Sequence, residues 1–340
     1  MSSFEVEQPI LNSPFAEPAE HWRIEEGTAP KRIPERRRAG YFYRDAKAPE
    51  PAAGEATRGE WHELELVNLI RERTAQWRAA DYPGVTRTTL DLIRHWRRDG
   101  RQQPLFYAQV EAAETIIFLK EARSDLHQGI DIPPEIVPDD VDPFTRYACK
   151  MATGSGKTTV MGMLAAWSIL NKVNDRTDGR FSDVVLIVCP NVTIRHRLRE
   201  LDPELGEASL YRTRDLVPGH LMSLLAQGRV LVANWHVFEP QAVQTAGVSS
   251  KVTKAGVEVR TKETIHIGPK TTTARGTRYL TQEGFEKQVT AGLLTVIEEK
   301  RDKQGSLEKV FVESVRYVES DTSLINHVFA PNFTAQHAID

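Results

Sequence analysis

The sequence predicts an α/β protein built on a parallel sheet, with a helical extension on its N-terminal side and a small β insertion. Three observations predict this class. A glycine-rich phosphate-binding loop spans residues 151–158 (MATGSGKT), between a predicted strand and a predicted helix. Short apolar runs at 184–189 and 229–233 follow it with helical segments between them, as in a parallel sheet covered by crossover helices. Residues 241–280 alternate apolar and polar side chains, which is typical of antiparallel strands.

The composition of the whole chain is that of a folded protein. Its 340 residues are enough for two modest domains, and its net charge of -3 means that any contact with DNA must come from local basic patches. Cys149 and Cys189 have no metal-ligand spacing, so we expect two buried, reduced thiols. No stretch reaches the roughly 18 apolar residues of a membrane span, and residues 1–15 lack the features of a signal peptide. We therefore expect a cytoplasmic protein with no membrane contact.

Residues 1–58 predict a mostly irregular N-terminal arm, because they are rich in Pro, Glu, Ala and Arg and show little periodicity. The basic run 31–38 (KRIPERRR) favours a solvated arm over a DNA-binding arm. Trp22 and the aromatic residues 41–43 indicate that parts of the arm pack against something.

Residues 59–140 predict a helical extension. Helical spacing of apolar residues predicts three helices, over 60–79, from Thr88 or Thr89 to Arg98, and over 107–126. Asp81-Tyr82-Pro83-Gly84 supplies a turn after the first helix, and the prolines at 133, 134 and 138 indicate a loop after the third.

The phosphate-binding loop carries the clearest chemistry in the chain. We expect a strand over 146–150 and a helix over 159–171, with the loop between them. Thr153, Gly154, Ser155 and Gly156 would bring backbone N–H groups to phosphate oxygens, assisted by the positive end of the helix. Lys157 would reach the β- and γ-phosphates and Thr158 would hold Mg²⁺, so these two are the candidate catalytic residues.

The remaining elements are expected within one domain over 141–340. The run 184–189 predicts a strand buried on both faces, followed by helices through Glu200 and over 218–227, and then a strand over 229–233. The basic β insertion covers about 245–280, with seven Lys or Arg against two Glu between Lys251 and Arg278. It is either a DNA grip or a solvated hairpin. A helix over 281–301 and strands over 309–313 and 315–318 complete the expected elements.

Four segments together resemble the first RecA-like domain of superfamily 2 helicases and translocases. Residues 150–158 are especially similar to the Res subunits of type III restriction enzymes, where the first loop glycine is commonly replaced, as Met151 replaces it here. Residues 106–112 (FYAQVEA) resemble the adenine-recognising Q motif, which implies that Gln109 selects ATP; the alternative is an ordinary helical glutamine. Residues 188–193 (VCPNVT) resemble motif Ia, and 232–236 (VANWH) resemble a later DNA-contacting motif.

The resemblance implies binding of ATP, Mg²⁺ and double-stranded DNA, and a DNA-methyltransferase subunit as a further partner. It also implies contacts to the phosphodiester backbone from residues after the strands, without reading of sequence. The candidates are Thr193, Arg195, Asn234 and His236. For His236, a structural role in its loop is an equal alternative.

The carboxylates needed for hydrolysis are not evident in the sequence. No Asp-Glu pair follows an apolar strand after Ala233, and there is no room for a second RecA-like domain. We therefore expect the N-terminal portion of an ATP-dependent translocase or, as the alternative, a module that binds ATP and DNA without turnover. A small-molecule kinase is disfavoured by the long segment ahead of the loop.

Overall fold

The computed structural model describes residues 6, 8–25, 28–45, 59–132, 145–238, 257–268, 278–301 and 305–318. The packing of the chain divides it into two compact units, Met1–Ala233 and Asn234–Asp340. This border falls inside the range 141–340 that the sequence assigns to one domain. Each unit is described by itself.

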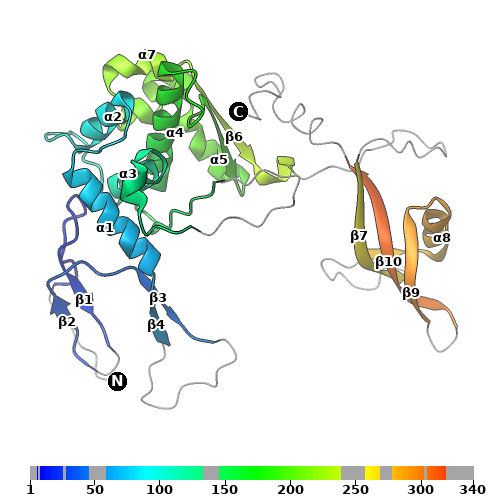
Figure 1. Ribbon diagram of the computed structural model, residues 1–340. Helices are drawn as coiled ribbons and strands as arrows, with labels where there is room; N and C mark the ends of the chain where they lie inside the picture. The colour runs from blue at the N-terminus through cyan, green and yellow to red at the C-terminus, as the bar shows by residue number, and fades with distance from the viewer. Residues whose placement is uncertain are drawn as a thin grey trace. The chain divides into compact units, whose positions relative to one another are not determined.

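The N-terminal arm contains two short antiparallel hairpins (Figure 1). Strand β1 (His21–Arg23) pairs with β2 (Lys31–Ile33), and β3 (Gly40–Tyr43) pairs with β4 (Glu60–Glu63). Strands of three or four residues are too short to show a periodic pattern, so the sequence could only indicate an irregular arm. The helix predicted from residue 60 begins at Glu65, because residues 60–63 pair with β3.

Four helices form the body of the first unit. Their bounds are α1 Glu65–Ala79, α2 Arg87–Arg97, α3 Tyr107–Glu121 and α4 Lys157–Asn174, with the short η1 Ser124–His127 after α3. The three helices predicted between residues 60 and 126 are therefore confirmed as helices, with shifted bounds. Apolar side chains from all four helices meet in one core, whose fully covered members include Trp77, Leu92, Ile93, Ile117, Phe118, Met163 and Ile169. The helix that begins in the phosphate-binding loop is therefore packed against the helical extension.

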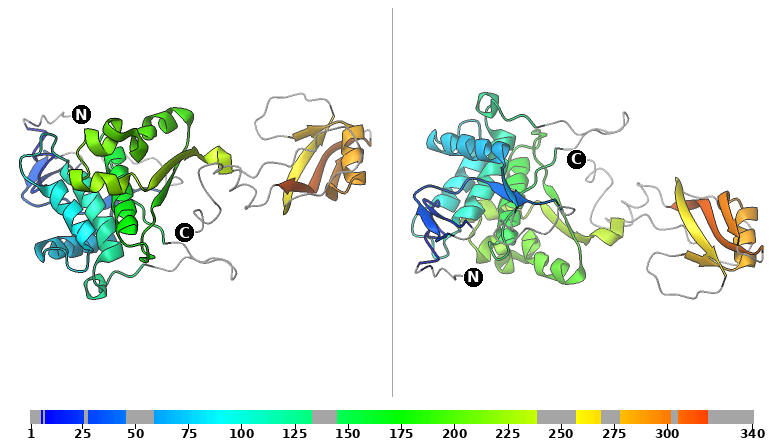
Figure 2. Two further views of the ribbon diagram at one scale, coloured as in Figure 1. Left: turned by 90° about the horizontal axis from the view of Figure 1, so that it is seen from above. Right: turned by 90° about the horizontal axis from the view of Figure 1, so that it is seen from below.

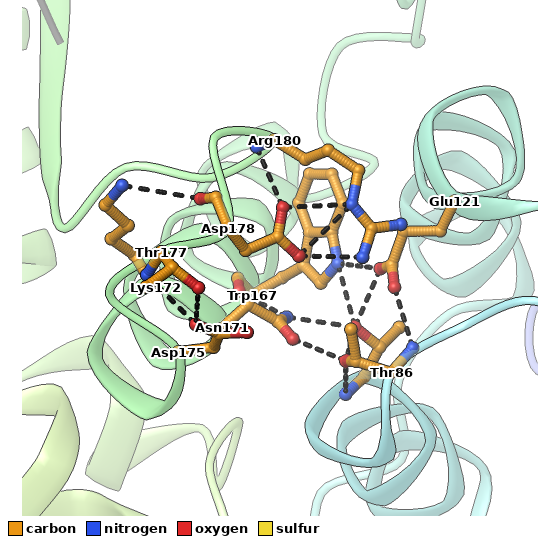
Figure 3. A network of polar contacts seen from close by, with 10 residues as sticks. Thr86, Glu121, Trp167, Asn171, Lys172, Asp175, Thr177, Asp178 and Arg180 are labelled. Carbon is orange, nitrogen blue, oxygen red and sulfur yellow. Dashed lines mark hydrogen bonds and ion pairs between the residues drawn. The ribbon is translucent and has the colours of Figure 1, made fainter.

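A buried polar network also joins three of these helices (Figure 3). The carboxylate of Glu121 on α3 is only 3% exposed, and it accepts three hydrogen bonds. The donors are the backbone N–H of Thr86 at 2.9 Å, the hydroxyl of Thr89 at 2.7 Å and the indole N–H of Trp167 at 2.5 Å. Thr86 itself caps α2 by accepting from the N–H of Thr89 at 3.0 Å. The network fixes α4, through Trp167, against α2 and α3.

The parallel sheet of the first unit is a pair of strands, β5 (Val184–Cys189) and β6 (Arg229–Asn234). Between and after them lie α5 Val192–Leu198, η2 Arg199–Leu201, η3 Pro203–Ala208, α6 Leu210–Thr213, η4 Gly219–Leu221, α7 Met222–Leu225 and η5 Trp235–Phe238. Both strands were predicted correctly, and so was the helix that follows β5.

Two expectations about this sheet are wrong. Residues 146–150 form no strand, and β5 is not buried on both faces. Ile187 and Cys189 point into the core, whereas Leu186 is 41% and Val188 is 50% exposed. The apolar run predicted double coverage, but among the described residues only the face that meets the helical core is covered. An apolar sequence alone does not say how many layers cover a strand.

The second unit is a four-stranded sheet with a helix against one face (Figure 2). Its strands are β7 Val257–Ile267, β8 Arg278–Leu280, β9 Leu294–Arg301 and β10 Leu307–Val318, in the order β8-β7-β10-β9, and its helix is α8 Gln282–Thr290. β7 and β8 are parallel and the other neighbours are antiparallel. Phe285 of α8 packs on a small core that includes Ile265, Leu294, Val310 and Val312.

The local predictions for this unit are partly wrong. β7 is a strand, as predicted, but its long partner is β10, from His266 opposite Lys309 to Val257 opposite Val318. The helix predicted over 281–301 ends at Thr290, and Gly292 follows it with a φ of 70°. A glycine in this left-handed conformation stops a helix. The next residues form β9, and the two strands predicted near 309–318 are the single strand β10. Lys251, Lys254, Lys270 and Arg275 of the basic insertion lie outside the described residues.

Candidate nucleotide-binding site

The loop before α4 has the backbone conformation that its glycines predict. Gly154 and Gly156 have φ values of 82° and 80°, in the left-handed region that side chains disfavour. The hydroxyl of Ser155 donates to the carbonyl oxygen of Ala152 at 2.7 Å, which closes the turn. Thr153 and Gly154 are exposed at the tip of the loop. The loop therefore presents its backbone at the beginning of α4.

The positive charge of Lys157 lies at the mouth of this loop. Lys157 is the first residue of α4 and is exposed. Its amine donates to the carbonyl oxygens of Ala152 at 3.0 Å and Met151 at 3.3 Å. The first N–H groups of a helix have no acceptor within the helix, and they carry the positive end of its dipole. The amine and the start of α4 together make a site suited to an anion such as phosphate.

Gln109, the residue expected to select ATP, lies against the loop. It is the third residue of α3 and is only 6% exposed. Its side-chain oxygen accepts from the backbone N–H of Phe106 at 2.9 Å, which caps α3. Its amide nitrogen is directed at Gly156, since a Cβ added to Gly156 would overlap that nitrogen. Gln109 is therefore a buried glutamine that caps α3 and contacts the loop, rather than an exposed one.

The N-terminal arm reaches the same end of α3. The backbone N–H of Tyr107 donates to the carbonyl oxygen of Pro14 at 2.8 Å. The rings of Phe15 and Phe106 lie 5.5 Å apart between centroids. Sequence reasoning did not find this contact, because no local pattern in the arm predicts which helix it meets.

Thr158 is the residue that could hold a metal ion. It lies half-buried on the first turn of α4, next to Lys157. The described residues contain no group of three or more His, Cys, Asp or Glu that could hold a metal by themselves. Mg²⁺ is commonly held by one or two protein oxygens together with phosphate oxygens and water. The hydroxyl of Thr158 beside a phosphate-binding loop fits that kind of site.

The candidate DNA-contacting residues fall in both units. In the first unit, Thr193 is exposed and Arg195 is half-buried on α5, whose first turn is capped by Asn191, which accepts from the N–H of Ile194 at 2.9 Å. In the second unit, Asn234 is 8% exposed at the end of β6. His236 is exposed in η5, and its ring centroid lies 3.9 Å from that of Trp235. Thr193 and Arg195 therefore lie on the helix that follows β5, and Asn234 and His236 lie at the end of β6 and directly after it.

The two cysteines differ from each other. Cys189 is buried as predicted, with its thiol 3.3 Å from the carbonyl oxygen of Ala233 on β6. Cys149 is exposed, which contradicts the prediction. The reason is that residues 146–150 do not form the strand whose burial would have covered it.

Comparisons with protein-family models, curated proteins and solved structures gave no significant match to this chain. Within the described ranges, no helix combines the length and the apolar character that a membrane crossing requires. The functional argument therefore depends on the geometry of the loop and its neighbours.

Proposed function

We propose that this chain is the ATP- and DNA-binding N-terminal part of a DNA translocase with a RecA-like domain, of the kind found in type III restriction enzymes. The observation that carries this proposal is the phosphate-binding loop, with Lys157 at its mouth and Gln109 packed against Gly156. The proposal is further supported by the parallel pair β5 and β6, which follows the loop in the order that such a domain requires.

Each residue of the site has a defined task in this proposal. The loop N–H groups hold the phosphates, and Lys157 exchanges the carbonyl oxygens of Met151 and Ala152 for phosphate oxygens. Thr158 contributes one oxygen to Mg²⁺, which would neutralise phosphate charge. Gln109 offers its amide to the adenine edge after the side chain turns away from Gly156. Hydrolysis of ATP would then drive movement on double-stranded DNA in the cytoplasm, with a DNA-methyltransferase subunit as a partner.

The alternative function is binding of ATP and DNA without turnover. It is favoured by the residues that follow the two strands of the parallel pair. β5 is followed by Pro190 and Asn191, and β6 ends at Asn234 with Trp235 and His236 after it. Neither strand end carries a carboxylate that could orient water or bind Mg²⁺. A site that positions ATP without such a carboxylate holds the nucleotide but accelerates its hydrolysis only weakly.

The test is ATP binding by a Lys157→Ala variant in the presence of Mg²⁺. We expect at least a tenfold loss of affinity (on the order of 1.4 kcal/mol or more), because a charge-assisted contact to phosphate is removed. Lys172→Ala is the matched control, since Lys172 lies on the last turn of the same helix and donates to Asp178 at 3.3 Å. Unchanged affinity in Lys157→Ala would refute the site. Hydrolysis stimulated by double-stranded DNA and lost in Lys157→Ala would exclude the alternative function.

A further inference from the structure

Two adjoining cavities in the N-terminal arm lie apart from the loop at α4. Their volumes are about 440 Å³ and 540 Å³. Five residues from the two hairpins and the segment between them line both cavities. They are His21, Arg37, Arg38, Phe42 and Trp61. The 540 Å³ cavity adds Arg36, Arg71 and Glu20 to this lining, and the 440 Å³ cavity adds Arg23, Glu25, Glu35 and Glu63. The two cavities therefore form one concave surface, which we call the arm groove.

The cations of the arm groove are not all paired. Arg36 is held by Glu111 at 2.6 Å, and Arg38 forms an ion pair with Glu63. Arg71 projects from α1 and is half-buried, yet no carboxylate in the described part of the chain pairs with it. Burial lowers the pKa of Arg71 and the neighbouring charge of Arg36 lowers it further, while the charges of Glu111 and Tyr107 act in the opposite direction and only partly offset this. A half-buried cation beside another cation gains free energy when an anion binds between them.

Arg37 is the second cation in this groove without a carboxylate partner among the described residues. Its guanidinium lies over the ring of Trp61, 5.7 Å from the centroid. A guanidinium in this position keeps its N–H groups available to an anion, because a ring face accepts no strong hydrogen bond from them.

The aromatic side chains of the arm groove form a platform next to these charges. Trp61 and Phe42 lie opposite each other in the β3–β4 pair and meet edge to face, with ring centroids 4.9 Å apart and planes inclined by 64°, and they are 39% and 43% exposed. Gly40 gives the indole its place, since a Cβ there would overlap the ring of Trp61. Tyr43 and His62 pair at 5.9 Å and do not line either cavity. The platform is therefore specific to one side of the hairpin.

We propose that the arm groove binds single-stranded nucleic acid, with phosphates on Arg37 and Arg71 and a base packed against the exposed surfaces of Trp61 and Phe42. Exposed aromatic rings beside unpaired cations are the combination that single-strand binding uses. A base in a duplex has both faces covered by its neighbours, so it cannot use such a platform. This site is separate from the nucleotide loop and does not depend on the translocase proposal.

The test measures binding of a fluorescently labelled oligothymidylate to the full chain by fluorescence anisotropy at low salt. Trp61→Ala and Arg71→Ala should each weaken binding about 5- to 100-fold. The first variant removes a ring surface for a base, and the second removes a contact to phosphate. Trp61→Phe keeps a ring and should bind nearly as tightly as the wild type, which shows that the hairpin still forms.

Two matched controls sharpen this test. Tyr43→Ala removes an exposed ring from the same hairpin but outside the groove. Arg73→Ala removes a cation from the same helix as Arg71, where it contacts Gln76 at 3.2 Å instead of the groove. Both controls should bind the oligonucleotide as the wild type does. The proposal would be overturned if the controls lost as much affinity as Trp61→Ala and Arg71→Ala, or if these two variants lost none. It would also be overturned if the wild type did not bind the oligonucleotide, or if duplex DNA competed equally well.

Discussion

The contact between Gly156 and Gln109 allows the two functions of a loop glycine to be separated. Gly154 and Gly156 have almost the same φ, 82° and 80°. A Cβ added to Gly154 would meet nothing within 4 Å, whereas one added to Gly156 would overlap the amide nitrogen of Gln109 and lie 3.1 Å from its Cδ. Gly154→Ala therefore introduces backbone strain alone, and Gly156→Ala introduces the same strain and a steric overlap.

The expected magnitudes follow from these differences. A side chain in the left-handed region costs about 1–2 kcal/mol, which is the expected destabilisation of Gly154→Ala. Gly156→Ala must also displace Gln109, which breaks the 2.9 Å hydrogen bond from the N–H of Phe106. This loss adds about 1 kcal/mol. In the double variant Gly156→Ala/Gln109→Ala the overlap is gone, so its destabilisation should be smaller than the sum of the two single effects by about 1 kcal/mol.

The assay is urea unfolding followed by tryptophan fluorescence. Of the six tryptophans, all except Trp235 lie in the first unit, so the signal reports mainly on that unit. If Gly156→Ala and Gly154→Ala are equally destabilised, or if the double variant shows simple additivity, the packing of Gln109 on the loop is refuted. Measurement of ATP affinity in the same variants then shows whether the displaced glutamine changes nucleotide binding.

Two further predictions concern the helices that support the loop. Glu121→Ala should destabilise the first unit by about 3 kcal/mol, because it removes the acceptor of the Thr86 backbone N–H and of the Thr89 hydroxyl, and it leaves the Trp167 N–H with the Thr89 hydroxyl alone. Glu121→Gln keeps one acceptor oxygen and should cost less; equal effects in urea unfolding would contradict the network. Burial lowers the pKa of His95, and the charges of Arg98 and Arg101 act in the same direction, against the contact with Asp215. As the pH falls, His95 therefore binds a proton in the unfolded chain before it does so in the folded chain. Acidification below about pH 6.5 should lower the free energy of unfolding of the wild type more than that of His95→Gln. Parallel pH profiles of unfolding in the two proteins would refute this.

The phosphate-binding loop shows what a local sequence can predict. The glycines at 154 and 156 indicate a tight turn, and both residues adopt the left-handed backbone that glycine allows at little cost. The helix after the loop and the strands at 184–189 and 229–233 were predictable for a similar reason, since their apolar spacing or propensity acts within a few residues.

The errors concern partners that lie far apart in the sequence. Residues 146–150 have the composition of a strand, but a strand exists only where a neighbour supplies its hydrogen bonds. The segment 294–301 ends in helix-favouring residues (EEKR), yet it forms β9 because β10 pairs with it. The exposure of Leu186 and Val188 on β5 is a third example. Whether a second face of a strand is buried depends on other elements that pack on it, and the sequence of the strand does not specify them.

The sequence by itself determined the glycine-rich loop with Lys157 after it and the helices that follow the arm, because short-range preferences specify each of them. Only the tertiary structure decided that Gln109 rests on Gly156, and that Arg71 of α1 joins Arg37, Phe42 and Trp61 in one groove. These residues come from separate elements, and no local preference reports which elements meet. Their meeting depends on long-range packing, in which the buried area of the whole core outweighs any single residue's preference.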